Sequence, residues 1–459
     1  MDLLARLAAE LGDAVTVDPA RLAAVRTDKS GFLAAGTPLA VVDAVSIEQV
    51  QATLRLASEF GVGVVPRGAG TGLAGGATGG DGVIVLGVAG MDRILEIAPA
   101  DELAVVQPGV LNADLDAALE PYGLWYAPDP ASKAISSIGG NIATNAGGLL
   151  CAKYGVTREA VLGLKVVLAD GRLLSTGRRT VKGVTGYDLT ALLVGSEGTL
   201  GVVVEATLRV RPRRTGDVVT IGAFFPTVRQ AAAASAAIVE ARLRPAVMEL
   251  LDGQSLSAIR AYLGDEVVRD AVGPASGDGF LLVQLDESPA PETVLYVVEL
   301  IERAGGQSRM STDAATGEQL MMIRRSFHSA LEARGEVLIE DVSVPRSRLA
   351  DAFDAIADVS AEYGVQIPTA AHAGDGNLHP NFVLEGGVLT QRVRDAADAL
   401  FRAALRLGGT LTGEHGVGIL KRHHLLDELG PDSYALQRQL KAVFDPQGIL
   451  NPGKVFETS

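Results

Sequence analysis

Pro66-Arg67-Gly68-Ala69-Gly70-Thr71-Gly72-Leu73-Ala74-Gly75-Gly76 is the stretch of this chain that decides the fold. It follows an apolar strand expected at residues 62–66, and Gly70, Gly72 and Gly75 satisfy the pattern GxGxxG. In a Rossmann fold a helix begins at these glycines, so that its N-terminus meets the pyrophosphate. The residues that follow are too rich in glycine to form a stable helix. We therefore reject a Rossmann fold and expect the backbone N–H groups of the loop to bind phosphate as an anion nest, with Arg67 either adding a charge or solvated.

Two further glycine-rich segments lie at residues 137–148 and 195–201, and both mix glycine with Ser, Thr or Asn. A single segment of this kind most often forms a tight turn. Three of them in one chain predict loops that approach a large, extended ligand closely, because glycine lets the backbone come near.

A second informative region is His372-Ala-Gly-Asp-Gly-Asn-Leu-His379, followed downstream by Gly413-Glu414-His415-Gly416. The first segment reads as a β-hairpin whose turn is centred on Asp375-Gly376. In that register His372 and His379 face each other across the strands, with Cβ atoms about 4.5–5.5 Å apart. Glu414 would complete a His2Glu metal set with open coordination positions, which is typical of a catalytic site. The alternative is a pair of turn histidines hydrogen-bonded to the backbone.

Composition limits the class of protein. At 459 residues the chain is long enough for two or three domains, and 47% hydrophobic residues provide ample core. A net charge of −15 argues against nucleic acid or an anionic membrane surface as a partner. The single cysteine, Cys151, fits a reducing compartment. Charged residues interrupt the N-terminus, and the most apolar helical stretch, 231–241, is too short to span a bilayer. We expect a soluble, cytoplasmic protein without an integral membrane segment, and peripheral membrane association is left open.

Secondary structure alternates along the chain. Ser46 and Gln49 form a capping box, and Gly61 is placed to end the helix that follows. Further strands are expected at 83–86, 162–168, 172–175 and 201–210, with a hairpin turn at Asp170-Gly171. Arg211-Pro212-Arg213-Arg214 marks a domain boundary. Beyond it we expect a two-layer α+β domain with strands at 280–284 and 337–344 and helices at 291–304, 348–363 and 390–407.

Together these motifs resemble the FAD domain of the vanillyl-alcohol oxidase superfamily. The His-Ala-Gly-Asp-Gly-Asn-Leu-His and Gly-Glu-His-Gly segments, with Asn451-Pro452-Gly453-Lys454, narrow the resemblance. It is to the branch that holds the glycolate oxidase FAD subunit, FAD-linked D-lactate dehydrogenase and D-2-hydroxyglutarate dehydrogenase. The resemblance extends from about residue 43 to residue 456.

The resemblance implies an α+β chain in which a two-part FAD-binding domain carries an inserted α+β substrate cap. Residues 1–212 would form the first part, residues 213–412 the cap with its metal-binding hairpin, and residues 413–459 the returning segment. The expected FAD contacts are Pro66, Arg67, Gly68, Ala69, Gly70, Thr71, Gly72, Leu73, Pro128, Asp129, Ser137, Gly139, Gly140, Asn141, Thr144, Asn145, Gly147, Gly148, Glu197, Gly198, Gly201, Val203 and Asn451. Because the phosphate loop contains no histidine, we expect FAD to be bound non-covalently.

The expected chemistry is oxidation of a D-2-hydroxy acid to the 2-oxo acid, with hydride transfer to FAD. A divalent metal, zinc favoured over manganese, would chelate the substrate through His372, His379 and Glu414. His415 is the expected base, the alternative being that it ligates the metal while Glu414 orients it. Asn381, two residues beyond His379 on the same strand face, would orient a substrate oxygen. The resemblance assigns the substrate carboxylate to Arg324, although either it or Arg325 could instead be a solvated helix charge.

One position bears on the substrate. D-2-hydroxyglutarate enzymes carry a lysine shortly before an Asp-x-Ser-x-Pro-like strand, whereas this chain has Ile339, with Glu340 beside it. An apolar and an acidic residue disfavour a second carboxylate, so D-lactate or glycolate is the favoured substrate. The alternatives are a D-2-hydroxyglutarate dehydrogenase, a non-redox flavin enzyme resembling alkylglycerone-phosphate synthase, and a flavin-free metal hydrolase. The electron acceptor would be a quinone, a cytochrome, an electron-transfer flavoprotein or oxygen.

Overall fold

The computed structural model describes residues 2–272 and 276–457, and the chain forms two compact units. Unit 1 comprises Met1–Gly148, Gly155–Arg213 and Glu414–Ser459, and unit 2 comprises Leu149–Tyr154 and Arg214–Gly413. The sequence interpretation had placed the boundaries at residues 212/213 and 412/413. It had not anticipated that the short segment 149–154 belongs to unit 2.

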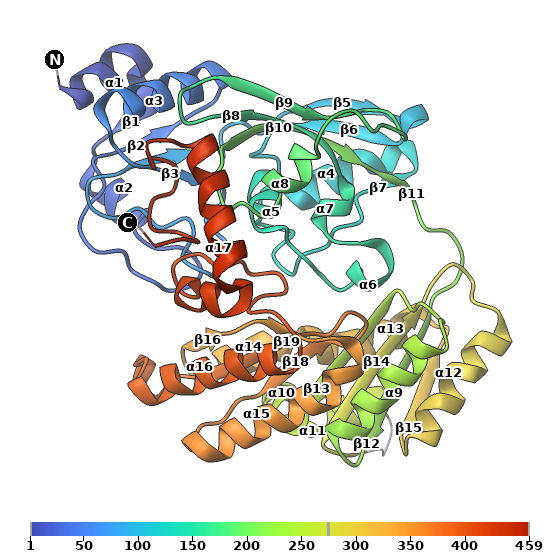
Figure 1. The fold of residues 1–459 in the computed structure, drawn as a ribbon. Helices are drawn as coiled ribbons and strands as arrows, with labels where there is room; N and C mark the ends of the chain where they lie inside the picture. Colours follow the sequence, from blue (N-terminus) through green and yellow to red (C-terminus); the bar gives the residue numbers. More distant parts are fainter. Residues whose placement is uncertain (1, 273–275, 458–459) are drawn as a thin grey trace. The chain divides into compact units, whose positions relative to one another are not determined.

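Unit 1 contains two main sheets (Figure 1). The first has four strands in the order β1 (Val15–Thr16), β2 (Ala40–Asp43), β4 (Ile84–Gly87) and β3 (Val64–Arg67). The second has five antiparallel strands in the order β5 (Ile94–Ala98), β6 (Leu103–Val106), β10 (Val202–Arg209), β8 (Val161–Val167) and β9 (Leu173–Gly177). A short pair joins β7 (Leu124–Trp125) to β11 (Arg211–Pro212). The principal helices are α1 (Leu3–Leu11), α2 (Pro19–Ala24), α3 (Ile47–Phe60), α4 (Asn112–Leu119), α5 (Ile138–Thr144), α7 (Thr157–Ala160), α8 (Leu189–Leu193) and α17 (Leu425–Phe444).

Helix α3 begins and ends where the sequence predicts. The Ser46 hydroxyl accepts a hydrogen bond from the Gln49 amide at 3.3 Å, and the Gln49 side chain accepts one from the Val45 amide at 2.8 Å. Gly61 closes the helix with a left-handed φ of 65°. The capping interaction is therefore confirmed, with its return bond one residue earlier than in a standard capping box.

The loop between β3 and β4 has no helix anywhere along its length, which the structure describes in full. These two strands are nevertheless parallel neighbours, with Val64 paired to Ile84. The rejection of a Rossmann fold is confirmed. The expected hairpin at Asp170-Gly171 also forms, between β8 and β9.

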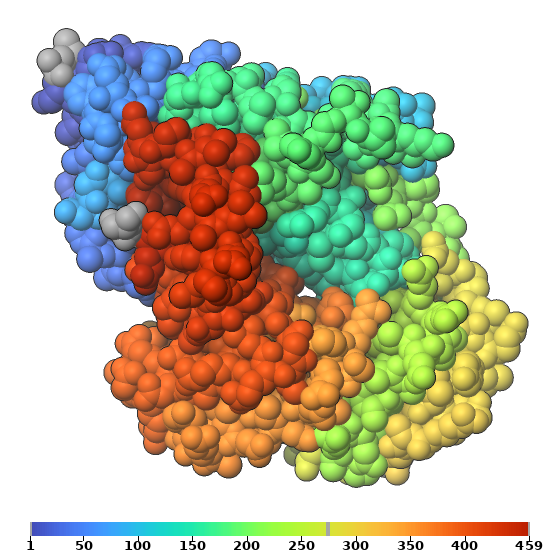
Figure 2. All heavy atoms as spheres, in the orientation of Figure 1, coloured from blue at the N-terminus to red at the C-terminus, as the bar shows by residue number. Residues whose placement is uncertain are grey.

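The C-terminal segment returns to the first sheet of unit 1. The Val64 amide donates to the carbonyl of Ile449, and the Asn451 amide donates to the carbonyl of Val64, both at 2.7 Å. In Figures 1 and 2 this red segment lies against the blue N-terminal part of the chain. Residues nearly 400 positions apart in sequence thus share one unit.

Unit 2 is built on one antiparallel sheet of eight strands. Seven follow the order β15 (Gln307–Ser311), β12 (Val219–Phe225), β14 (Gly279–Leu285), β13 (Val247–Asp252), β18 (Thr369–His372), β19 (Asn377–Val383) and β16 (Val337–Ile339). The eighth, β17 (Val342–Ser343), also pairs with β19, so the strand expected at 337–344 is broken at residues 340–341. The helices are α6 (Cys151–Tyr154), α9 (Val228–Glu240), α10 (Gly253–Leu263), α11 (Asp265–Val272), α12 (Pro291–Arg303), α13 (Ala314–Arg325), α14 (Phe327–Glu332), α15 (Leu349–Tyr363) and α16 (Gln391–Arg406).

Helices cover both faces of this sheet, so the expectation of two layers is wrong. One core combines side chains of β12, β13 and β14 with α9, α12, α15 and α16. A second core on the opposite face combines the alternate side chains of the same strands with α10, α11, α13 and α14. The two-residue alternation of side chains along each strand produces this division, because β12, β13 and β14 place apolar residues on both faces of the sheet.

Among residues 2–272 and 276–457, the structure contains no helix with the length and hydropathy needed to cross a membrane.

Candidate active site

The glycine loop after β3 in unit 1 is held by its own arginine. Arg67 Nη1 donates to the carbonyl oxygens of Thr27 at 2.9 Å and Ala77 at 2.8 Å. Gly70 adopts a φ of +73°, and a Cβ placed there would lie 2.3 Å from Arg67 Nη2. The Arg67 guanidinium therefore shapes the loop from inside, a role that the sequence interpretation did not foresee.

The three glycine-rich segments meet in unit 1. A Cβ at Gly68 would lie 2.5 Å from the Ser137 hydroxyl, which caps helix α5. A Cβ at Gly198 would lie 3.0 Å from Pro66 Cγ. The loop thus touches both other segments, as one shared ligand would require.

Asn451 connects the C-terminal segment to the junction of the three glycine-rich segments. Its side-chain amide donates to the carbonyl oxygens of Gly76 at 3.0 Å and Glu197 at 2.7 Å. Asn451 Oδ1, Asn141 Nδ2 and Ser136 Oγ are buried and have no hydrogen-bond partner within the described part of the chain. Buried polar atoms of this kind normally have a partner, so they fit a large polar ligand such as FAD.

Several of the other predicted FAD residues have defined contacts within unit 1. Asn112 Nδ2 donates to the Pro128 carbonyl at 3.1 Å, and a Cβ at Gly148 would lie 2.3 Å from the Asp129 carbonyl. Asn145 ends α5 with a left-handed φ of 52°. Their direct contact with FAD stays a prediction.

Glu197 has a role that its sequence motif did not reveal. Its carboxylate accepts hydrogen bonds from the amides of Val417 at 2.7 Å and Gly418 at 2.8 Å. Burial raises the pKa of Glu197 to about 7, although these two donors and the positive charge of Lys421 act in the opposite direction. Glu197 therefore fixes the backbone that follows the Gly413–Gly416 motif.

This pKa predicts how stability depends on pH. Below pH 4.5 Glu197 is protonated in both folded and unfolded states, whereas between pH 4.5 and about 7 the folded state binds the extra proton. Unfolding free energy measured in urea should therefore fall as pH rises through this window, by on the order of 3 kcal/mol relative to Glu197→Gln. A difference between wild type and variant that does not change with pH would contradict this assignment.

The histidine hairpin in unit 2 has a different register from the expected one. Strands β18 and β19 pair His372 with Asn377 and Ala370 with His379, so the turn is centred on Gly374-Asp375. His372 and His379 are diagonal neighbours on one face of the sheet rather than directly opposed. Their rings still meet edge to face, with centroids 5.1 Å apart.

Glu249, on the neighbouring strand β13, is the residue directly opposite His372. His372 Nδ1 lies 2.7 Å from Glu249 Oε1, and Arg324 Nε donates to Glu249 Oε2 at 2.7 Å. The side chains of Glu249 and Arg324 are 1% and 11% exposed. Arg325 instead points outward and pairs with Glu318, so the ambiguity between the two arginines is resolved in favour of Arg324 as the residue at the hairpin.

Glu414 follows Gly413 directly in the chain. His372 and His379 belong to unit 2, whereas Glu414 is counted with unit 1, so a metal site shared by the three residues stays a prediction. Two imidazoles and a carboxylate are ligands that suit zinc and manganese. His415 Nε2 lies 3.9 Å from Glu414 Oε1, and its side chain is 10% exposed.

Two further residues of β16 and β19 flank the histidines. Asn381 is fully buried, and its Nδ2 donates to the carbonyl of His379 at 2.7 Å. Its Oδ1 has no hydrogen-bond partner among the described residues. Ile339 pairs with Asn381 across the strands, and Glu340 next to it is buried.

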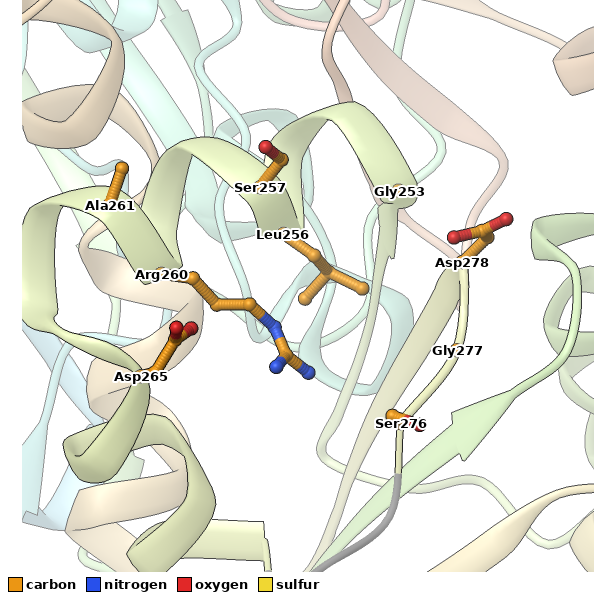
Figure 3. Close-up of a pocket in the computed structure, with 9 residues that line it drawn as sticks. All are labelled: Gly253, Leu256, Ser257, Arg260, Ala261, Asp265, Ser276, Gly277 and Asp278. Atoms are coloured by element: carbon orange, nitrogen blue, oxygen red, sulfur yellow. The ribbon is translucent and has the colours of Figure 1, made fainter.

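A surface pocket of about 640 Å³ in unit 2 contains none of the predicted site residues. Figure 3 shows its lining, which comes from α10, the start of α11 and the segment before β14. Arg260, Asp265 and Asp278 are its charged residues.

Two family descriptions match the sequence. "FAD binding domain" matches residues 38–177, and "FAD linked oxidases, C-terminal domain" matches residues 215–455. The chain belongs to the FAD-linked oxidase family and is an FAD-binding oxidoreductase. The resemblance to this branch of the vanillyl-alcohol oxidase superfamily is confirmed.

Among its relatives is the glycolate oxidase subunit GlcD of Bacillus subtilis (strain 168), which is 41% identical over 427 residues, 91% of this chain and 89% of that protein. A D-lactate dehydrogenase of Archaeoglobus fulgidus is 34% identical over 417 residues, 90% of each chain. Of solved structures, p-cresol methylhydroxylase with substrate bound shares the fold with a TM-score of 0.80 at 18% identity, over 99% of this chain and 96% of that one. Alkyldihydroxyacetonephosphate synthase gives a TM-score of 0.70 at 18% identity, over 98% and 84%.

Two residues that organise the site, Glu249 and Asp341, are absent from the sequence predictions, and the backbone contacts of a third, Glu197, are not predicted either. Glu249 is the lone charge inside an apolar strand, and that isolation was a usable signal. Asp341 is fully buried and binds the Thr412 hydroxyl and the Gly413 amide, just before Glu414. Glu197 was assigned to FAD, and no local pattern pairs it with residues more than 200 positions away.

Proposed function

We propose that this protein oxidises a D-2-hydroxy acid, D-lactate or glycolate, to the 2-oxo acid with FAD as the hydride acceptor. The observation that carries the proposal is the contact of the His372 and His379 rings beside the buried Glu249 and Arg324, in a chain of the FAD-linked oxidase family. Relatives named glycolate oxidase subunit and D-lactate dehydrogenase support the substrate class.

His372, His379 and Glu414 would hold a divalent metal, zinc in preference to manganese. Three protein ligands leave open positions for the hydroxyl and a carboxylate oxygen of the substrate. A metal bound there acts as a Lewis acid that lowers the pKa of the substrate hydroxyl.

Arg324 would bind the substrate carboxylate through its Nη atoms, because its Nε contacts Glu249. Asn381 would orient a substrate oxygen through the second N–H of its side-chain amide, because the first is donated to the carbonyl of His379. His415 would remove the hydroxyl proton, since a neutral imidazole accepts a proton near neutral pH. FAD, when bound, supplies the acceptor for the hydride that leaves the substrate carbon.

The residues beside Asn381 favour a monocarboxylic substrate. Ile339 offers no charge, and a buried Glu340 would repel a second carboxylate. Steady-state oxidation with an artificial dye acceptor tests this choice. We expect kcat/KM for D-lactate or glycolate to exceed that for D-2-hydroxyglutarate by at least about tenfold, equivalent to about 1.4 kcal/mol. A preference for the dicarboxylate would contradict it.

His415→Ala should slow flavin reduction by about 10²- to 10⁴-fold, because general-base catalysis contributes on this order. Bound metal should be unchanged, as measured by elemental analysis of the purified variant. His328→Ala is the control, since His328 is not one of the residues assigned to the metal or to the substrate. Loss of metal from His415→Ala would show that His415 is a ligand rather than the base.

A further inference from the structure

Glu249 contacts two side chains with different tasks in the proposed reaction. One carboxylate oxygen lies 2.7 Å from His372 Nδ1, and the other accepts from Arg324 Nε at the same distance. All three residues belong to unit 2, and Glu249 is 1% exposed. The arrangement leaves Nε2 as the ring nitrogen of His372 that can face a metal.

We propose that Glu249 is a positioning residue that fixes the tautomer of His372 for metal binding and, with its other oxygen, orients Arg324. This inference rests on the proposed function, because it assumes that His372 binds a metal. The inference adds Glu249 to the proposed site, as the carboxylate that connects His372 with Arg324.

The chemistry of a metal-bound imidazole supports this role. A histidine that donates its second N–H to a carboxylate is held in one tautomer and one ring orientation, and it becomes a more basic ligand. Arg324 in turn compensates the charge of a carboxylate that is otherwise shielded from water. The cross-strand pairing of Glu249 with His372 builds the contact into the sheet itself.

Loss of a purely structural ion pair would leave the Zn²⁺ affinity of the protein unchanged. Arg325 and Glu318 form such a pair on the same helix, α13, with side chains 55% and 61% exposed. Glu318→Gln removes a carboxylate from an arginine just as Glu249→Gln does, but at an exposed ion pair rather than a buried one. It is therefore the matched control.

The test measures the Zn²⁺ dissociation constant of FAD-loaded, chelator-stripped protein by competition with a chromophoric chelator. Glu249→Gln should weaken Zn²⁺ binding by about 10- to 100-fold, the usual effect of removing a carboxylate behind a metal-bound histidine. Glu318→Gln should leave it unchanged. FAD content and far-UV circular dichroism confirm that each variant is folded.

The outcomes separate this inference from the proposed function. If wild-type protein binds Zn²⁺ through His372 and His379 but Glu249→Gln binds it equally well, the role of Glu249 is refuted alone. If wild-type protein binds neither Zn²⁺ nor Mn²⁺, the metal site of the proposed function fails as well. Weaker Zn²⁺ binding in Glu249→Gln, together with unchanged binding in Glu318→Gln, supports the inference.

A second measurement on metal-free wild-type protein applies if Glu249→Gln does not fold. Nitrogen-15 NMR of histidine-labelled protein, assigned by loss of a signal in His372→Gln, reports which ring nitrogen carries the proton. We expect the proton on Nδ1, where Glu249 accepts it. A His372 ring protonated on Nε2 alone would overturn the proposal.

Discussion

His379→Ala is expected to lower kcat for oxidation of the 2-hydroxy acid by about 10³-fold or more, because Lewis-acid activation contributes several kcal/mol. His379 is one of the three proposed metal ligands. Bound divalent metal should fall well below one per chain in elemental analysis. FAD should remain bound, since the glycine-rich segments belong to unit 1 and His379 to unit 2.

His328→Ala serves as the control for this variant, because it also removes an imidazole from unit 2. His328 is half-buried on α14 and is not one of the three proposed metal ligands. Its activity and metal content should match those of the wild type. Full activity with unchanged metal in His379→Ala would refute the ligand assignment.

Gly70→Val should yield protein that retains less than about a tenth of its FAD after gel filtration. Two effects combine at this position: a β-branched residue is strained at a φ of +73°, and its Cβ would lie 2.3 Å from Arg67 Nη2. Arg67 holds the loop through Thr27 and Ala77, so it cannot move without releasing them. The backbone N–H groups would then lose the arrangement that we expect to bind phosphate.

Gly82→Val, in the same β3–β4 connection, is the control that introduces backbone strain without a steric clash. Gly82 has a φ of +68°, but a Cβ there meets nothing within 4 Å. This variant should lose about 1–2 kcal/mol of stability from the left-handed backbone yet keep its FAD. Stoichiometric FAD in Gly70→Val, read from the visible absorbance, would show that the loop does not contact the cofactor.

Features encoded by neighbouring residues could be predicted from sequence. The helix 47–60 follows from Ser46, Gln49 and Gly61, which act within one or two turns of the chain. Rejection of a helix after Gly70 follows from glycine content alone. Local preferences decide both, so no tertiary information was needed.

Hairpin register depends on more distant contacts. The turn is centred one residue before the expected position, with Gly376 at a φ of +89° where a Cβ would lie 2.1 Å from the Val344 carbonyl. This close approach to Val344, the residue after β17, constrains the turn, and the residues of the turn do not reveal it. The two histidines consequently meet diagonally, although the prediction that their rings come together is confirmed.

Contacts between distant strands were the least predictable. Glu249 meets His372 because β13 pairs with β18, which are more than 100 residues apart. Strand β13 itself was not expected, since its apolar residues show no alternation when both faces are buried. The same burial hid the second helical layer of unit 2.

The visible spectrum of anaerobic protein before and after addition of D-lactate or glycolate is the most direct test of the proposed function. We predict an oxidised flavin spectrum that bleaches within seconds with at least one of the two acids, as electrons from the substrate reduce the flavin. A flavin that stays oxidised with both acids, in protein that holds FAD and metal, would contradict oxidation of a monocarboxylic 2-hydroxy acid.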